Sequence, residues 1–388
     1  MPAETVNFNL LHRTCKLVVL LSLLHIAVTV FFYVRSMDVR VAFVQNQQSR
    51  NAGTQRNQAF RHVLQQNQTR GSEQSVKTEP RPNESPKEDE QPEQKPTEPP
   101  PEKAEEEPKK AEEEPKKLEK CPETSPLLVG PLRVEFNTPV SLDQIVKENP
   151  NLQPGGRFKP KDCEAQQKVA LIIPFRKRDE HLKFWLYYLH PILQRQQLDY
   201  GVYVINQDGD EIFNRAKLLN IGYTEALKEY DYECFVFSDV DLIPMDDRNT
   251  YKCFSQPRHL SVSMDKFGFR LPYNQYFGGV SSMSKDQFLK INGFPNNYWG
   301  WGGEDDDIYN RIASKGMGIS RPSGDVGKCR MIRHERDKKN EPNPQRFNRI
   351  AHTRETMHKD GIASLTYRVV KTEKLPLYTK ITVDVGKP

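Results

Sequence analysis

A long polar segment rich in proline, from Gln45 to Lys120, limits where this 388-residue chain can fold. Between Thr78 and Lys120 the segment contains ten prolines, no aromatic residue and the tandem repeat KAEEEPKKAEEEPKK. Such a composition cannot bury enough apolar surface to offset the conformational entropy that ordering would cost. We therefore predict a disordered stem over residues 35–120 and a folded domain over residues 121–388.

An apolar run, LVVLLSLLHIAVTVFFYV, precedes the stem and occupies residues 17–34. About 18 apolar residues are just enough for a helix to cross a bilayer core. The residues that follow the run lack the small-x-small pattern of a signal-peptide cleavage site, so the run is predicted to be a membrane anchor after a tail of residues 1–16. Basic residues are balanced on its two sides, and charge alone leaves the orientation open.

The overall composition agrees with a chain that is only partly globular. Hydrophobic residues make up 36% of the chain, which also has 29 prolines and 28% charged residues. The formal net charge is only +5, and nucleic-acid-binding domains usually show a concentrated basic face. Composition therefore gives no support for nucleic-acid binding.

Cysteines and glycosylation sequons indicate an oxidising, lumenal setting. Two sequons, at Asn67 and Asn83, lie in the stem. The folded region has an odd number of cysteines, so two bridges and one free thiol is the simplest arrangement, although spacing alone leaves the connectivity open. These cysteines are Cys121, Cys163, Cys234, Cys253 and Cys329.

Apolar strands alternate with helical patterns in the folded region. Strands are predicted at Val169–Phe175, Gly201–Asn206 and Cys234–Ser238, and helices at Glu180–Gln197 and Glu211–Tyr230. This alternation predicts an α/β fold with a mostly parallel twisted sheet. Ligands of such sheets bind beyond the carboxyl ends of the strands, so the loops after these strands are the predicted site.

Pairs of aspartates separated by one residue occur in two of these loops. Asp239 and Asp241 follow a fully apolar strand, and their carboxylates could hold a divalent cation that neutralises a nucleotide diphosphate. Asp208 and Asp210 flank a glycine and are predicted to form an ordinary acidic turn.

The segment YWGWGGEDDD, residues 298–307, is the most distinctive in the chain. Indole rings stack on sugar faces, glycines act as hinges, and carboxylates accept protons from sugar hydroxyls. The acids from Glu304 to Asp307 would also favour the N-terminus of a helix over Ile308–Lys315. Both interpretations can hold, with some carboxylates at the helix end and one or two facing a pocket.

Five ordered motifs resemble the beta-1,4-galactosyltransferase family, and the match covers essentially all of residues 121–388. The motifs are PFRKRDEHL (174–182), FSDVDLIP (237–244), YFGGV (276–280), NGFPNNYWGWGGEDDD (292–307) and MIRHERD (331–337). They are most similar to the branch that forms N-acetyllactosamine. The resemblance implies a GT-A fold and a single-pass type II protein of the Golgi membrane with residues 121–388 in the lumen. A soluble form could arise by cleavage of the stem.

The resemblance implies a reaction and a cofactor. Galactose would pass from UDP-galactose to the 4-hydroxyl of a terminal N-acetylglucosamine, with inversion and with Mn²⁺ on the diphosphate. Asp241, Met331 and His334 match the metal ligands of the family. A methionine beside an apolar strand is ordinarily a core residue, and a regular strand running through Met331 to His334 would count against this ligand set.

The resemblance also implies roles for individual residues. Asp305 matches the catalytic base, Glu304 a carboxylate near the donor sugar, and Trp301 the tryptophan of a mobile loop. The implied donor-binding residues also include Pro174, Phe175, Arg176, Arg178, Phe213, Asp239, Val240, Lys266, Tyr276 and Gly279. The implied acceptor-binding residues are Asp305, Asp306, Arg346, Phe347 and Ile350.

Three further expectations follow from the resemblance and one from composition. Tyr276 would crowd an N-acetyl group on the donor and so favour UDP-galactose. Cys121 would pair with Cys163 and Cys234 with Cys253, leaving Cys329 free. The glycine, proline and charge content of the Trp301 loop and of residues 331–352 predicts that both order only when metal and donor bind. A modifier such as alpha-lactalbumin would bind a surface formed by Phe267, Tyr273, Gln275, Tyr276, Phe347 and Ile350.

Two alternatives remain open from the sequence. One is a lectin that holds N-acetylglucosamine without transfer, which the presence of Asp241, His334, Asp305 and Trp301 disfavours. The other is a related transferase that uses xylose or glucosylceramide as acceptor or N-acetylgalactosamine as donor sugar. Tyr276 and the sequence RFNRI (346–350) favour galactose transfer to N-acetylglucosamine.

Overall fold

A computed structural model describes residues 118–335 and 337–388 of the chain. The predicted anchor at residues 17–34, the stem up to residue 117 and the sequons at Asn67 and Asn83 lie outside these ranges. Within them, no helix combines the length and the apolar character needed to cross a membrane.

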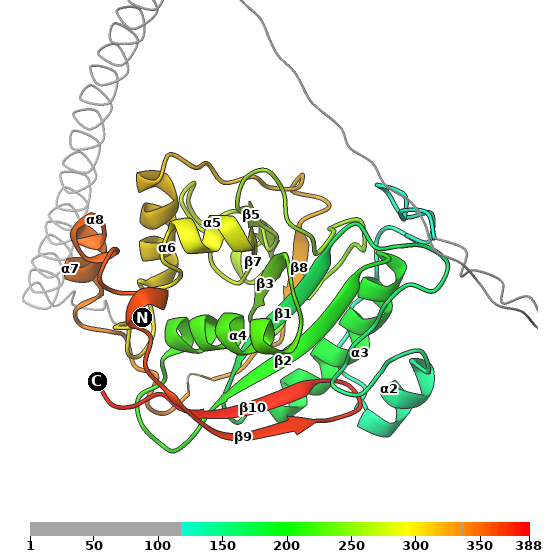
Figure 1. The fold of residues 1–388 in the computed structure, drawn as a ribbon, viewed down its shortest axis with the longest axis horizontal. Coiled ribbons are helices and arrows are strands. Elements are labelled where there is room, and N and C mark those ends of the chain that lie inside the picture. The colour runs from blue at the N-terminus through cyan, green and yellow to red at the C-terminus, as the bar shows by residue number, and fades with distance from the viewer. Residues whose placement is uncertain (1–117, 336) are drawn as a thin grey trace, which may run out of the picture. The chain divides into compact units, whose positions relative to one another are not determined.

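A seven-stranded sheet forms the centre of the domain, with the strand order β5-β7-β3-β1-β2-β10-β9 (Figure 1). Its strands are β1 (Lys168–Phe175), β2 (Asp199–Gln207), β3 (Cys234–Ser238), β5 (Arg258–His259), β7 (Val280–Ser284), β9 (Arg368–Lys374) and β10 (Thr379–Asp384). A second sheet, of order β4-β8-β6, is made by β4 (Leu242–Pro244), β6 (Ser263–Met264) and β8 (Lys328–Met331).

The helices include two longer ones that cover the main sheet. The α-helices are α2 (Leu142–Glu148), α3 (Asp179–Arg195), α4 (Arg215–Glu229), α5 (Lys285–Lys290), α6 (Glu304–Ser314), α7 (Arg346–Ala351) and α8 (Thr353–Thr356). Two short 3-10 helices are η1 (Asp265–Phe267) and η2 (Ile362–Ser364). The predicted strands and helices before Ser238 are all present.

Strand β1 is apolar throughout because both of its faces are buried. Val169, Leu171 and Ile173 pack in one core cluster, which also contains the apolar face of α3. Ala170 and Ile172 point to the opposite face and pack in a second cluster with α4, α5 and α6. Successive side chains of a strand point to opposite faces, so a helix on each side of the sheet requires a continuous apolar run.

The prediction of a mostly parallel sheet is correct only for its centre. Strands β3, β1, β2 and β10 are parallel to one another, whereas β7 runs antiparallel to β3, β5 to β7, and β9 to β10. Strands β9 and β10 are joined by a short connection, which favours antiparallel pairing. The sheet is therefore mixed, and the βα alternation before Ser238 did not indicate the antiparallel strands.

Helix α4 begins four residues later than the sequence pattern suggested. The side chain of Asn214 accepts a hydrogen bond from the backbone N–H of Lys217 at 3.0 Å and so caps the helix. Asparagine at this position satisfies one of the backbone donors that a helix leaves unpaired at its start. Glu211 therefore lies before the helix, and Arg215 becomes the first helical residue.

Two disulfides brace the domain with the pairing that the resemblance implied. Cys121 bonds to Cys163, and Cys234 bonds to Cys253. Cys329 is a buried free thiol on β8. Because β3 begins at Cys234, the second bridge ties the main sheet to the segment that leads to β5.

Candidate active site

A cavity of about 660 Å³ opens beyond the carboxyl ends of β1 and β3. The loop after β1 and the loop after β3 form one wall. The remaining walls come from the segment after η1, the first turn of α6 and the end of β8. The cavity thus lies at the edge of the sheet where ligands of α/β proteins usually bind.

Most residues singled out in the sequence line this cavity. They are Pro174, Arg176, Arg178, Phe213, Asp239, Val240, Asp241, Lys266, Tyr276, Gly279, Trp301, Glu304, Asp305, Asp306, Met331 and His334. Phe175 does not line it, because its side chain points into the core cluster beside α3. Arg346, Phe347 and Ile350 lie on α7 and are also absent from the cavity lining.

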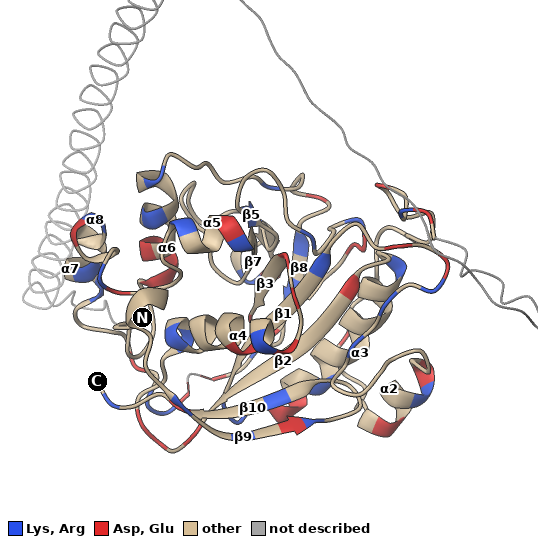
Figure 2. Ribbon diagram, viewed as in Figure 1, with Lys and Arg blue, Asp and Glu red and all other residues tan. Residues whose placement is uncertain are grey.

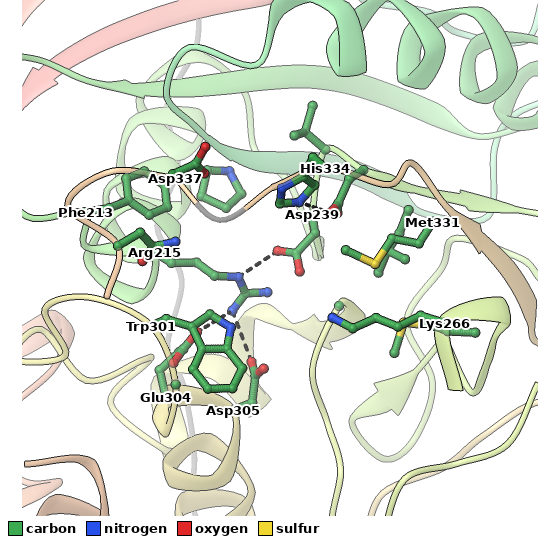
Figure 3. A pocket seen from close by; sticks show the side chains of 18 of the residues that line it. Phe213, Arg215, Asp239, Lys266, Trp301, Glu304, Asp305, Met331, His334 and Asp337 are labelled. Carbon is green, nitrogen blue, oxygen red and sulfur yellow. Dashed lines mark hydrogen bonds and ion pairs between the residues drawn. The ribbon is translucent and has the colours of Figure 1, made fainter. Parts of the chain in front are cut away.

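Arg215 connects carboxylates from two different elements at the centre of the site (Figure 3). Its Nε lies 2.7 Å from Oδ1 of Asp239, and its Nη1 lies 3.1 Å from Oδ1 of Asp305. The same Nη1 lies 3.7 Å from Oε1 of Glu304. A planar guanidinium with several fixed donors suits such a bridge better than an ammonium would.

Burial makes two of these carboxylates, those of Glu304 and Asp239, harder to ionise. Burial, with Asp305 nearby, raises the pKa of Glu304 to about 8, although Arg215 acts in the opposite direction. Burial also raises the pKa of Asp239 to about 6 against the same opposing charge. Burial disfavours the charge of Arg215 itself, but the three carboxylates outweigh this and raise its pKa. The cluster therefore holds protons close to neutral pH.

The two other acids at the start of α6 face different surroundings. Asp306 accepts a hydrogen bond from the hydroxyl of Tyr273 at 2.8 Å, and burial raises its pKa. Asp307 points away from the cavity and pairs with Arg311 at 2.6 Å, a fully buried residue one turn further along the helix. The acidic run therefore serves both a helix start and a pocket, as the sequence suggested.

Asp241 and His334 are adjacent at the end of the cavity that β8 forms. Oδ2 of Asp241 lies 3.1 Å from Nε2 of His334, although the residues are 93 positions apart in sequence. Strand β8 ends at Met331, and the residues from Ile332 to His334 are irregular, so no regular strand runs through to His334. Figure 3 shows Met331 and His334 pointing into the cavity near Asp239.

The surroundings of His334 fit a bound divalent cation. Nδ1 of the ring lies 2.6 Å from the carbonyl oxygen of Glu335, and with Nδ1 as donor, Nε2 and Asp241 present lone pairs to each other. Two ligand atoms that each lie about 2.1 Å from one ion and subtend a right angle at it are about 3 Å apart. The observed 3.1 Å between Nε2 of His334 and Oδ2 of Asp241 is close to this distance. The alternative tautomer accepts at Nδ1 from Arg178 at 2.7 Å. The hydrogen bond to Asp241 raises the pKa of His334. A bound cation would take the place of the proton in this hydrogen bond.

Among residues 118–335 and 337–388, no group of three or more His, Cys, Asp or Glu side chains is arranged to hold a metal ion. Asp241 and His334 thus need a ligand of another type, and the thioether of Met331 lines the same cavity. A thioether is a soft ligand, whereas Mn²⁺ prefers oxygen and nitrogen. If Asp241, His334 and Met331 bind the ion, oxygen atoms of a bound substrate would therefore supply much of its coordination.

Basic side chains lie beside the candidate metal ligands. Arg178 contacts both His334 and Asp337, and its side chain is only 15% exposed. Arg176 donates to the carbonyl oxygen of Glu211 at 2.6 Å and stacks over the ring of Phe213 at 4.9 Å. These guanidiniums, with Arg215, supply fixed positive charge suited to phosphate oxygens.

Trp301 closes one side of the cavity through backbone pairing with a distant segment. Its N–H donates to the carbonyl of Glu341 at 2.8 Å, and its carbonyl accepts from the N–H of Asn343 at 2.9 Å. Gly300 has φ +80°, and a Cβ there would lie 2.5 Å from the carbonyl oxygen of Glu341. Only glycine at this position permits the close approach of the two segments.

Helix α7 packs against the first turn of α6 at the rim of the cavity. A Cβ on Gly303, which has φ +101°, would lie 2.8 Å from the Cβ of Arg346 and 3.4 Å from Ile350. Figure 2 shows the basic helix α7 close to the acidic start of α6. Phe347, next along α7, is 71% exposed. Two of the three predicted acceptor residues, Arg346 and Ile350, therefore lie beside Gly303, which lines the cavity, and Phe347 is on the same helix.

Sequence reasoning missed Arg215, His181 and Asp337, which also line the cavity. The place of Arg215 in the site could have been predicted, because a helix that follows β2 must begin at the same edge of the sheet as the loops after β1 and β3. His181 lies on α3 within the motif PFRKRDEHL, and its ring is 5.3 Å from that of His334. Its pKa is lowered by burial and by Arg178.

Two protein-family models match the chain. One is described as the N-terminal region of glycosyl transferase group 7 and matches residues 121–254. The other is described as the N-terminal domain of galactosyltransferase and matches residues 258–335. Each of the two matched ranges contains residues that line the cavity.

Curated relatives are similar over the whole folded domain. Beta-1,4-galactosyltransferase 1 of Mus musculus is 74% identical over 268 residues, which cover 69% of this chain and 67% of that protein. Beta-1,4-galactosyltransferase 2 of Mus musculus is 62% identical over 269 residues, covering 69% of this chain and 73% of that protein.

A solved structure supports the fold. The catalytic domain of Drosophila beta1,4galactosyltransferase 7 in complex with xylobiose is 30% identical, with a TM-score of 0.51, covering 57% of this chain and 95% of that one. A mutant of the same protein, in complex with manganese, UDP-Gal and xylobiose, matches with the same score. The domain described above thus has a GT-A-like glycosyltransferase fold with a mixed sheet.

Proposed function

This chain belongs to the beta-1,4-galactosyltransferase family, and from that premise we propose that it transfers galactose from UDP-galactose to the 4-hydroxyl of terminal N-acetylglucosamine. The products are N-acetyllactosamine units on glycoproteins and glycolipids, with inversion at the anomeric carbon. The observation that carries the proposal is a single cavity that joins a cation-binding pair, Asp241 and His334, to a carboxylate that Arg215 orients, Asp305.

The donor occupies the side of the cavity that carries the basic residues. Arg176, Arg178 and Lys266 provide positive charge for the diphosphate of UDP-galactose. Asp241, His334 and Met331 would hold Mn²⁺, which would supply positive charge to stabilise the departing diphosphate. Asp239 lies next to this group and interacts with Arg215, so it links the donor end of the site to the base.

Asp305 accepts the proton of the acceptor hydroxyl. As the 4-hydroxyl oxygen bonds to the anomeric carbon of galactose, the bond from that carbon to the phosphate oxygen breaks, and the hydroxyl proton passes to Asp305. Arg215 binds Oδ1, and a Cβ on Gly278 would lie 2.3 Å from Oδ2, so a glycine leaves Oδ2 accessible. Direct displacement from the opposite face inverts the anomeric centre.

The acceptor sugar is held by Asp306 and by the rim of the cavity. Tyr273 orients Asp306 through its hydroxyl, and Trp301 presents an indole that is 51% exposed for stacking on a sugar ring. Arg346, Phe347 and Ile350 on α7 form the pocket for the N-acetyl group. Tyr276 lies beside the donor and excludes an N-acetyl substituent there, which favours UDP-galactose.

Transfer to a panel of acceptors tests the proposal. The full chain in detergent is incubated with UDP-galactose, Mn²⁺ and either N-acetylglucosamine, glucose, xylose or glucosylceramide, with Asp305→Asn as the control. Mn²⁺-dependent transfer to N-acetylglucosamine that the variant loses is the expected result. Sugar binding without transfer supports a lectin, and transfer to another acceptor contradicts the assigned acceptor pocket.

We also propose that residues 17–34 anchor the protein in the Golgi membrane, with residues 1–16 in the cytoplasm and residues 121–388 in the lumen. The apolar run, the two sequons and the family resemblance support this orientation. Protease treatment of intact microsomes should spare the catalytic domain, and glycosidase treatment should shift the mass if Asn67 or Asn83 is occupied. Cleavage within the stem would release a soluble form.

An alpha-lactalbumin-type modifier is a further proposal for this family member. The aromatic residues Phe267, Tyr273 and Tyr276 line the cavity, and Phe347 on α7 is exposed. A partner covering them would narrow the acceptor site. Addition of alpha-lactalbumin should then promote transfer to glucose, and Phe347→Ala should weaken that effect without loss of transfer to N-acetylglucosamine at saturating acceptor.

A further inference from the structure

The segment that carries Tyr276 lies between η1 and β7 and has little regular structure of its own. We call residues 273–279 the Tyr276 loop. The side chain of Tyr276 lines the cavity. A Cβ on Gly278 would lie 2.3 Å from Oδ2 of Asp305 and 2.7 Å from the hydroxyl oxygen of Tyr276. The loop backbone thus abuts both the base and the residue assigned to donor choice.

Arg321 binds the backbone of this loop from outside the cavity. Its Nη2 donates to the carbonyl oxygens of Asn274 and Tyr276, both at 2.9 Å. Its Nε donates to Nδ1 of His259 at 3.3 Å. Within the described ranges Arg321 has no ion pair with a carboxylate, so the guanidinium directs these donors to the loop and to the histidine beside it.

His259 supports the other end of the loop. Its side chain is fully buried, and Nε2 lies 2.9 Å from the carbonyl oxygen of Gly278. Because Arg321 donates to Nδ1, Nε2 carries the ring proton and donates to this carbonyl. The ring also makes a T-shaped contact with the ring of Tyr276, at a centroid distance of 5.4 Å and an interplanar angle of 83°. Burial lowers the pKa of His259 to about 3, so the ring stays neutral.

His259 lies on the main sheet and holds the segment that carries Arg321. His259 ends β5, and its N–H donates to the carbonyl of Ser320 at 2.9 Å, which fixes Arg321 one residue later. The hydroxyl of Ser261 donates to the same Gly278 carbonyl at 3.0 Å and accepts from the N–H of Val280 at 2.8 Å. The contacts therefore join the Tyr276 loop to β5 and β7.

We propose that Arg321 and His259 are positioning residues that set the donor preference by fixing Tyr276. The inference rests on the proposed function and adds the residues that make its selectivity possible. A tyrosine excludes an N-acetyl group only while its ring cannot move aside, and the direction of the side chain is set by its main chain. Loss of the two carbonyl contacts or of the ring contact would let Tyr276 retreat and admit the bulkier donor.

Donor competition in single variants of the full chain tests this. The measured quantity is the ratio of kcat/KM for UDP-galactose to kcat/KM for UDP-N-acetylgalactosamine. Arg321→Met and His259→Phe should each lower the ratio about tenfold, equivalent to about 1.4 kcal/mol. Arg258→Met is the matched control, because Arg258 precedes His259, is half-buried, stacks on Phe254 at 4.1 Å and, among the described residues, makes no hydrogen bond to the loop. Its ratio should not change.

A double variant separates positioning from general support of the fold. If Arg321 acts through Tyr276, then Arg321→Met added to Tyr276→Leu should not change the ratio further. A ratio that stays at the wild-type value in folded Arg321→Met, with both donors slowed equally, overturns the inference. Wild-type protein that transfers no galactose overturns the proposed function instead, so the two failures are distinct.

Milder variants keep the test decisive if Arg321→Met does not fold. Ser261→Ala removes one of two hydrogen bonds to Gly278, and His259→Gln keeps a donor near Nε2 while it removes the ring. Both should lower the donor ratio about threefold. Wild-type ratios in both variants, measured on protein with a normal melting temperature, would refute the positioning role.

Discussion

Replacement of Arg215 by methionine should destabilise the protein, and more at alkaline than at acid pH. The guanidinium lies 2.7 Å from Asp239, 3.1 Å from Asp305 and 3.7 Å from Glu304. Its side chain is 16% exposed, so solvent screens these pairs only weakly. Methionine keeps the apolar stem of the side chain and removes its charge.

The size of the effect follows from the burial of the partners. Removing one member of a buried ion pair costs about 3–5 kcal/mol, because the remaining charge is left unpaired. We take the lower limit, about 3 kcal/mol at pH 8, because carboxyls in such a site bind protons and so reduce the cost. The free energy of unfolding should fall by this amount.

The pH dependence follows from the raised pKa values. Glu304 has a pKa of about 8 and Asp239 of about 6 in the folded protein, both above their ordinary values. Such a carboxyl destabilises the fold increasingly as pH rises from its unfolded pKa to its folded pKa. Arg215 lowers both pKa values, so its loss would raise them further, whereas at pH 5 both groups are already largely protonated and depend little on Arg215 for neutralisation. The loss should then be about 1 kcal/mol.

Thermal unfolding at a fixed scan rate measures both values. At about 2–4 °C per kcal/mol for a domain of this size, the melting temperature should fall by about 6–12 °C at pH 8 and by about 2–4 °C at pH 5. Arg176→Met is the control, because Arg176 donates to backbone carbonyls and has no ion pair within the described residues. Equal losses at the two pH values would refute the role assigned to Arg215.

Four further predictions concern catalysis, selectivity, the metal and the disulfides. Asp305→Asn should lower kcat by about 10²–10⁴-fold with KM for UDP-galactose little changed in steady-state kinetics, and an unchanged kcat would exclude it as the base. Tyr276→Leu should make UDP-N-acetylgalactosamine a competent donor; identical donor ratios in mutant and wild type would contradict this. EDTA should abolish transfer and Mn²⁺ restore it, and His334→Ala should require more Mn²⁺ in a titration, whereas an unchanged requirement would argue against His334 as a ligand. Cys253→Ser opens a bridge across a separation of 19 residues and should cost about 3 kcal/mol in unfolding experiments, whereas a wild-type melting temperature would count against a stabilising bridge.

Local sequence was sufficient for the central strands and for two of the site loops. The runs VALIIPF and CFVFS are apolar at every or nearly every position, which only a strand buried on both faces requires. The residues after them must then lie at one edge of the sheet, so Arg176 and Asp239 could be assigned to the site. Among the antiparallel strands, β5 has only two residues, β7 is rich in serine and β9 is largely exposed, and their pairing depends on connections that carry no periodic pattern.

The sequence alone determined which chemical groups this protein possesses, and the tertiary structure decided which of them meet. The acidic run 304–307 predicted a helix start, but only the packing of α6 directs Asp305 to Arg215 and Asp307 to Arg311. Asp241 and His334 are 93 residues apart, and Arg321 reaches the Tyr276 loop across 45 residues. Contacts of this kind arise from chain topology and side-chain packing, which one-dimensional periodicity does not encode.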